Sequence, residues 1–89
     1  MAFSEFGRRV KENDSAGTDH GTAGPVFLAG SPVRGGVNGK ASNLTDLVDG
    51  DLKTQFDFRQ VYASVLDRWL GISSEKVLGG KFETLDLFA

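Results

Sequence analysis

An amphipathic stripe in the second half of the chain is the feature that most constrains the fold. Its apolar residues are Phe58, Val61, Tyr62, Val65, Leu66, Trp69 and Leu70. They recur at the spacing that places side chains on one face of a helix. Asp57 is a good N-cap, Gln60 completes a capping box, and Gly71 suits the position after the last turn. The pattern predicts one main amphipathic helix over residues 57–70, with Trp69 facing the core.

Short strands separated by glycine-rich connections are predicted for the rest of the chain. Apolar runs indicate strands at 2–6 and 25–29, the second of them buried, and a short strand with a tight turn at 31–39. Residues 8–15 and 17–24 are predicted to be loops, the former with an alternative helical turn. Residues 40–56 are predicted to be a loop with a turn at 49–51 and, as an alternative, one helical turn. A brief helix is expected at 73–78, and the tail 82–88 either adds an edge strand or packs as an extended arm.

These elements predict one small domain over residues 1–89. The expected fold class is α/β, with a short sheet, one main amphipathic helix at 57–70 and a long glycine-rich connection. With 89 residues, its core lies near the lower limit of independent stability. The predicted strand at 2–6 begins almost at Met1, so we expect the chain to be fragment-like, with an upstream catalytic part absent.

Composition argues against several classes of partner. The formal net charge of −2 gives no general attraction to nucleic acid or to anionic membranes, so neither is expected as a partner. No apolar run approaches the length that spans a bilayer. Arg8 and Arg9 form a twin arginine, but a hydrophilic segment follows them where an export signal needs an apolar core. The chain as encoded is therefore expected to be cytoplasmic.

Two sets of residues are candidates for binding chemistry. Asp19 and His20 combine a carboxylate with the only imidazole, and Glu5 lies in an otherwise apolar run, so these three are candidate ligands for a divalent metal such as zinc. The alternative is that His20 hydrogen-bonds within a loop and Glu5 faces solvent. Arg8 and Arg9 are candidates for holding a phosphate or sulfate, or else are a solvated pair of charges.

Several motifs in order resemble a known family. They are FSEFGRR (residues 3–9), EN (12–13), GTDHG (17–21), VRGG (33–36), DFRQVYA (57–63) and WLG (69–71). Together they resemble the carboxy-terminal part of a large bacterial family of uncharacterised proteins. That family usually carries twin-arginine export signals and belongs to the alkaline phosphatase and sulfatase superfamily. The resemblance covers nearly the whole chain.

The resemblance implies a metal-dependent hydrolase framework. In that superfamily, metal ligands lie at the ends of strands in a parallel-rich sheet, and a nucleophile attacks a phosphate or sulfate ester. Placed on this chain, residues 4–6 fall where an Asp-His ligand pair would lie, with His20 at the position of a later single histidine. Phe6 cannot bind metal, so that site is altered or absent. The rival placement puts Asp19 and His20 at the pair itself.

The resemblance also implies that the nucleophile and early ligands lie upstream of this chain. The leading hypothesis is therefore a truncated or excised part of a phosphatase- or sulfatase-like hydrolase, without catalysis by itself, that retains a weak spot for metal or anion. One alternative is a small oligomeric hydrolase whose site is completed across an interface. Another is a non-enzymatic assembly or binding module. Sheet edges left open by the missing part predict a homo-oligomer.

Overall fold

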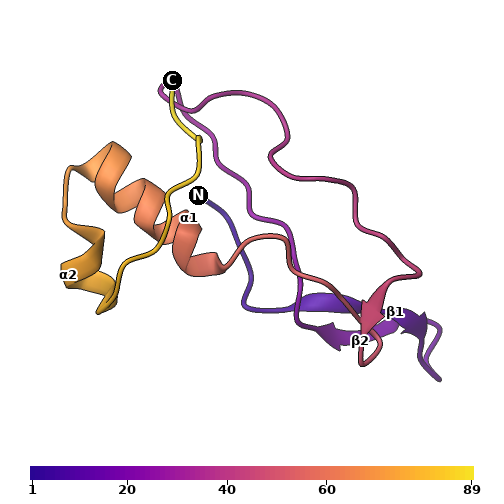
Figure 1. Ribbon diagram of the computed structural model, residues 1–89. Coiled ribbons are helices and arrows are strands. Elements are labelled where there is room, and N and C mark those ends of the chain that lie inside the picture. The colour runs from indigo at the N-terminus through magenta and orange to yellow at the C-terminus, as the bar shows by residue number, and fades with distance from the viewer. The chain divides into compact units, whose positions relative to one another are not determined.

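The computed structural model describes residues 1–89, which form two compact units. The hairpin unit contains Met1–Ala29 and Gly39–Gln55, and the helical unit contains Gly30–Asn38 and Phe56–Ala89. Each unit therefore combines segments that are distant in the sequence. Two short antiparallel sheets and the helices shown in Figure 1 make this a small α/β fold, as predicted.

The hairpin unit is built from two antiparallel pairs of strands. Strand β1 (Gly7–Glu12) pairs with β2 (Thr18–Gly21), and this register places Arg8 opposite His20. Strand β3 (Leu47–Val48) pairs with β4 (Asp51–Leu52). Asp49 and Gly50 join the second pair with φ angles of 51° and 82°, the left-handed conformation that a two-residue hairpin turn requires. The predicted turn is confirmed at Asp49 and Gly50, but the short strands β3 and β4 flank it where a loop was predicted.

Strands β1 and β2 correct the predictions made for this part of the sequence. Residues 8–15 and 17–24 were expected to be loops, yet they supply both strands. The hairpin closes through Asn13, whose Oδ1 accepts hydrogen bonds from the backbone N–H groups of Ser15 (2.9 Å) and Gly17 (3.1 Å). An exposed hairpin held by its turn needs no alternation of apolar and polar residues. The apolar pattern of the sequence therefore did not predict β1 and β2.

The strands expected at 2–6 and 25–29 are not formed. These two segments meet only at an isolated bridge in which Ala2 and Phe27 exchange two backbone hydrogen bonds of 2.8 Å. Val26 and Phe27 were expected to be buried but are exposed. An apolar run forms a strand only where a neighbouring strand pairs with it along its length, and here each has a partner at one residue.

The helical unit begins where the capping signals predicted. Helix α1 (Phe58–Ser64) starts with a complete capping box between Asp57 and Gln60. It continues into a π-helix, η1 (Val65–Leu70), which ends at Gly71 with a φ of 64°. Helix α2 (Ser74–Leu78) follows and stops at Gly79, with a φ of 71°. The helices predicted at 57–70 and 73–78 are confirmed, although the second half of the first is not α-helical.

The apolar stripe of this helix is largely uncovered. Trp69 was expected to face the core but is 55% exposed, and Phe58 and Leu70 are exposed as well. Hydrogen bonds from i to i+5 turn a π-helix less per residue than an α-helix, so the last turn does not continue the face that α1 presents. Trp69 instead stacks on Phe88 in the tail, with ring centroids 6.2 Å apart.

A buried serine hydroxyl connects helix α1 to the tail. Ser64 is fully buried, and its Oγ donates to the carbonyl of Gln60 (2.7 Å) and accepts from the N–H of Leu85 (2.7 Å). The only buried hydrophobic residues of the chain are Ala63 beside it and Leu87 in the tail. The small core of the helical unit therefore depends on a polar contact as much as on apolar burial.

The tail is an extended arm that also holds the segment Gly30–Asn38. Val33 and Phe88 form an isolated bridge, and Arg34 N–H donates to the carbonyl of Leu87 (2.9 Å). In Figure 1 this magenta segment runs to the yellow C-terminus. Of the two alternatives for residues 82–88, the extended arm is confirmed.

Replacing Ser64 by alanine should destabilise the helical unit. The change leaves the Leu85 N–H without an acceptor, which costs about 1–3 kcal/mol of unfolding free energy. Denaturant unfolding followed by the fluorescence of Trp69, the only tryptophan, measures this loss. Exposed Ser31 is the matched control, because its change to alanine should alter stability by less than about 0.5 kcal/mol. Equal effects of the two changes would contradict this account of Ser64.

The start of α1 should lose stability in acid. Two hydrogen bonds from the Arg59 guanidinium, 2.9 and 2.6 Å long, hold the pKa of Asp57 at about 2, and the Arg59 backbone N–H adds to this effect. Because this pKa is lower than in the unfolded chain, the contribution is complete above pH ~4 and is lost as pH falls toward about 2. NMR titration should show Arg59→Gln raising the pKa of Asp57, and Arg68→Gln leaving it unchanged.

Candidate functional site

Strands β1 and β2 carry four of the five predicted site residues. Arg8 and Arg9 lie on β1, Asp19 and His20 lie on β2, and Glu5 precedes β1 (Figure 1). The hairpin register places Arg8 directly opposite His20. The structure therefore brings these residues into one part of the hairpin unit, as expected from their closeness in the sequence.

Asp19 and His20 do not converge on one point. They are consecutive residues of a strand, where successive side chains point to opposite faces. The Oδ1 of Asp19 accepts a hydrogen bond from Asn13 Nδ2 (3.0 Å), while the imidazole of His20 stacks on Phe6 with centroids 4.6 Å apart. The flexible loop expected at this position would have allowed both side chains to meet, but the strand separates them.

The residues of the chain do not fit a complete metal centre. Glu5 is exposed and makes no ion pair, and no group of three or more His, Cys, Asp or Glu side chains lies close enough to hold an ion. A zinc site needs three or four protein ligands. The metal site predicted at Glu5, Asp19 and His20 would therefore need ligands from outside the chain.

The two arginines have different roles in the hairpin unit. Arg9 crosses from β1 to the β3–β4 turn, where it donates to the carbonyl of Asp49 and lies 3.5 Å from Asp51 Oδ2. Arg8 is exposed and uses one N–H to donate to the carbonyl of Thr18 (3.1 Å). Arg9 thus joins two hairpins, whereas Arg8 retains guanidinium donors for a ligand.

Asp51 is the one residue near the predicted site whose side chain holds a buried, unpaired oxygen. Its Oδ1 has no hydrogen-bond partner, and a Cβ placed on Gly21 would lie 2.9 Å from it. Glycine at position 21 therefore permits the close approach of β4 to β2. Sequence reasoning treated Asp51 only as part of a turn, and its spacing from Arg9 gives no signal of their contact.

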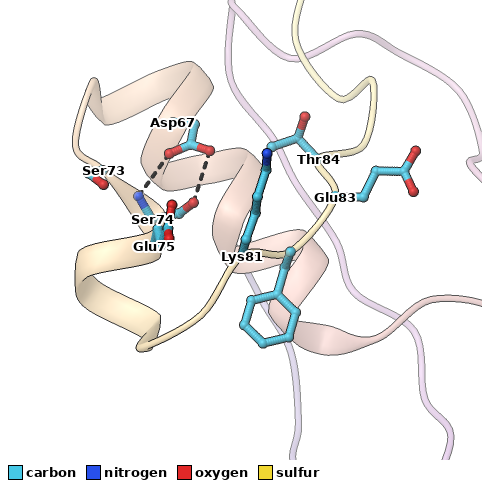
Figure 2. Close-up of a pocket in the computed structure, with 8 residues that line it drawn as sticks. Asp67, Ser73, Ser74, Glu75, Lys81, Glu83 and Thr84 are labelled. Atoms are coloured by element: carbon cyan, nitrogen blue, oxygen red, sulfur yellow. Dashed lines mark hydrogen bonds between the residues drawn. The ribbon is translucent and has the colours of Figure 1, made fainter.

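The helical unit holds a separate recess of about 390 Å³. Figure 2 shows Asp67 directed toward Ser74 at the start of α2, with Lys81 among the other residues that line the recess. The Oδ1 of Asp67 accepts from the Ser74 N–H (2.8 Å), and its Oδ2 accepts from the Ser74 hydroxyl (2.9 Å). The lining residues are Asp67, Ser73, Ser74, Glu75, Lys81, Phe82, Glu83 and Thr84.

Asp67 holds the start of helix α2 through the N–H and the hydroxyl of Ser74. Ser74 is buried and is the first residue of α2, where a backbone N–H has no carbonyl acceptor within the helix. The carboxylate satisfies that group. Sequence analysis missed Asp67 because the contact joins two helices.

Comparison with known proteins places the chain in a family. The family described as "Protein of unknown function (DUF1501)" matches residues 1–82. The chain belongs to the DUF1501 family. No curated protein and no solved structure matches it.

The DUF1501 match confirms the resemblance to a family of uncharacterised proteins. It extends over both strands of the β1–β2 hairpin and over helices α1 and α2, so it includes every candidate site residue. None of the helices in this DUF1501 chain is long and apolar enough to cross a membrane.

Arg9 should contribute more to stability than an exposed cation does. In Arg9→Met, the carbonyl of Asp49 and the partly buried carboxylate of Asp51 lose their donor, which should cost about 1.5–3 kcal/mol. Lys53→Met is the control, because the pair between Lys53 and Asp46 is exposed and should contribute at most about 1 kcal/mol. Amide hydrogen exchange in β1 and β2 measures both. Equal protection in the two variants would exclude Arg9 as the link between the hairpins.

Proposed function

We propose that this chain is part of a phosphatase- or sulfatase-like, metal-dependent hydrolase of the alkaline phosphatase superfamily and is not catalytic by itself. The ordered motifs between residues 3 and 71 support the superfamily assignment by resemblance. The DUF1501 match covers residues 1–82, and the family's description names no activity. The incomplete set of metal ligands around His20 supports the proposal that the chain is not catalytic by itself. A hydrolytic metal centre here would need further ligands from other protein.

The observation that carries this proposal is the amount of apolar surface left exposed. Fourteen large hydrophobic side chains are exposed, whereas Ala63 and Leu87 are the only buried hydrophobic residues. Full burial of one large apolar side chain stabilises a fold by about 1.5–3 kcal/mol, so covering even part of this surface would be strongly favourable. A chain that buries so few of its large apolar side chains has little core of its own, and packing against further protein would supply one.

An open edge on every strand favours the alternative of a homo-oligomer. The two sheets contain two strands each, so each strand has one edge without a strand partner. Such edges can pair with another chain. In this alternative, a second copy completes the hydrolase site across the interface or forms a non-enzymatic assembly. The cations Arg8, Arg9 and Lys11 on β1 oppose pairing of two β1 edges, so β2 is the edge that we propose for contact.

Arg8 is the residue that we propose for contact with an anion. Its guanidinium is exposed and has donors left after its bond to Thr18, and arginine binds phosphate and sulfate through paired N–H groups. Arg9 is less suited because Asp49 and Asp51 already engage it. The weak metal spot predicted at Glu5, Asp19 and His20 stays part of the proposal. Because Asp19 and His20 point to opposite faces of β2, one ion would take only one of them and would need its remaining ligands from other protein.

Assays on the purified chain test the proposal. We expect no hydrolysis of 4-nitrophenyl phosphate or 4-nitrophenyl sulfate above the buffer rate with added zinc, magnesium or manganese, and no stoichiometric metal by elemental analysis. His20→Ala should behave like the wild type. The exposed apolar surface should bind the dye ANS strongly, and binding should fall when further protein covers that surface.

The opposite outcomes separate the alternatives. Turnover that is lost in His20→Ala, together with a dimer in light scattering, would replace the proposal with the oligomeric hydrolase. A dimer without turnover would favour the assembly module. A monomer that binds no ANS would remove the argument from exposed apolar surface.

A further inference from the structure

The glycine-rich connection contains an asparagine that the rest of the fold leaves unprotected. Asn38 precedes Gly39, both are exposed, and Val37 before them is 94% exposed. Neither the side chain of Asn38 nor the N–H of Gly39 makes a hydrogen bond. A Cβ placed on Gly35 or Gly36 would have no atom within 4 Å. This part of the connection is therefore exposed to solvent.

The flanking residues show where the chain is held. Arg34 N–H donates to the carbonyl of Leu87 (2.9 Å), and Lys40 N–H donates to Gln55 Oε1 (2.6 Å). Between these two anchors, residues 35–39 make no backbone hydrogen bond. Gly39 also has a φ of 100°, which a residue with a Cβ rarely adopts. The backbone around Asn38 can therefore change conformation without breaking a backbone hydrogen bond.

The other two asparagines are held in place. Asn13 donates to Asp19 Oδ1 (3.0 Å) and accepts from Ser15 and Gly17 in the β1–β2 turn. Asn43 accepts from the Thr45 N–H (2.9 Å) and from its hydroxyl (2.7 Å). They precede Asp14 and Leu44, whose side chains hinder access to the backbone nitrogen. Asn38 alone combines a free side chain with a glycine after it.

We propose that Asn38 is a site of spontaneous deamidation and isoaspartate formation. The Gly39 backbone nitrogen loses its proton to solvent base and attacks Cγ of Asn38. The new N–Cγ bond closes a five-membered ring, and Nδ2 leaves as ammonia after taking a proton, which breaks the Cγ–Nδ2 bond. Water then adds to one of the two ring carbonyls. Cleavage of the N–Cγ bond gives aspartate, and cleavage at the α-carbonyl gives isoaspartate.

The product changes both charge and backbone in the connection. One amide nitrogen is exchanged for oxygen, so the neutral side chain becomes a carboxylate. In isoaspartate the main chain also runs through the side-chain carbon, which lengthens the connection by one methylene. Gly35 and Gly36 leave room for such a change, because no atom lies within 4 Å of a Cβ placed on either of them. The reaction therefore alters Asn38 without requiring either unit to unfold.

Incubation of the purified full chain at mildly alkaline pH tests the proposal. Peptide mapping with electron-based fragmentation, which distinguishes aspartate from isoaspartate, should find both products at position 38, with Asn13 and Asn43 intact. A synthetic peptide of residues 34–42, incubated alongside, should react at the same rate because the fold gives Asn38 no protection. Asn38→Gln should abolish the isoaspartate signal, and Gly39→Ala should slow its appearance.

Two results would overturn the proposal. One is that Asn38 in the full chain reacts much more slowly than in the peptide, which would show that the fold restrains it. The other is that Asn13 or Asn43 reacts as fast as Asn38. Circular dichroism of Asn38→Gln and Gly39→Ala should match the wild type, and the exposed Asn38→Asp variant provides the aspartate standard.

Discussion

The helical unit depends on the hydroxyl of Ser64. This group is fully buried, and it bonds the carbonyl of Gln60 within α1 and the N–H of Leu85 in the tail. The tail in turn holds the segment that contains Val33 and Arg34. Because so few apolar side chains are buried, specific hydrogen bonds decide how the tail lies against the helix. Asp67 does the same for helix α2 by bonding Ser74.

Close backbone approach and one arginine organise the hairpin unit. Arg9 reaches from β1 to the β3–β4 turn, and Gly21 lets the carboxylate of Asp51 lie against β2. The same geometry separates the predicted metal ligands, because Asp19 and His20 follow one another along a strand. A structural role for Arg9 and an exposed position for Arg8 thus arise from the alternation of side chains along β1.

The functional picture combines an incomplete site with incomplete burial. The hairpin unit presents an imidazole, carboxylates and a free guanidinium, but they form no group of three metal ligands. The exposed aromatic and aliphatic residues lie in both units. Both features have the same explanation under our proposal: the groups that finish the site and the surface that covers the apolar residues are supplied by other protein. Because the chain belongs to the DUF1501 family, the same proposal can be tested on other members of the family.

The sequence alone determined the local elements whose signals are contained within a few residues. The capping box at Asp57, the stop at Gly71, helix α2 with Gly79 and the turn at Asp49-Gly50 were all predictable, because each depends on contacts or φ angles of near neighbours. Only the tertiary structure decided which segments pair and which apolar residues are buried. Pairing depends on partners distant in the sequence, so β1 and β2 formed from polar residues while the apolar run 25–29 did not form a strand. The exposure of Trp69 and the separation of Asp19 from His20 follow from this long-range pairing and packing, which a local sequence pattern does not predict.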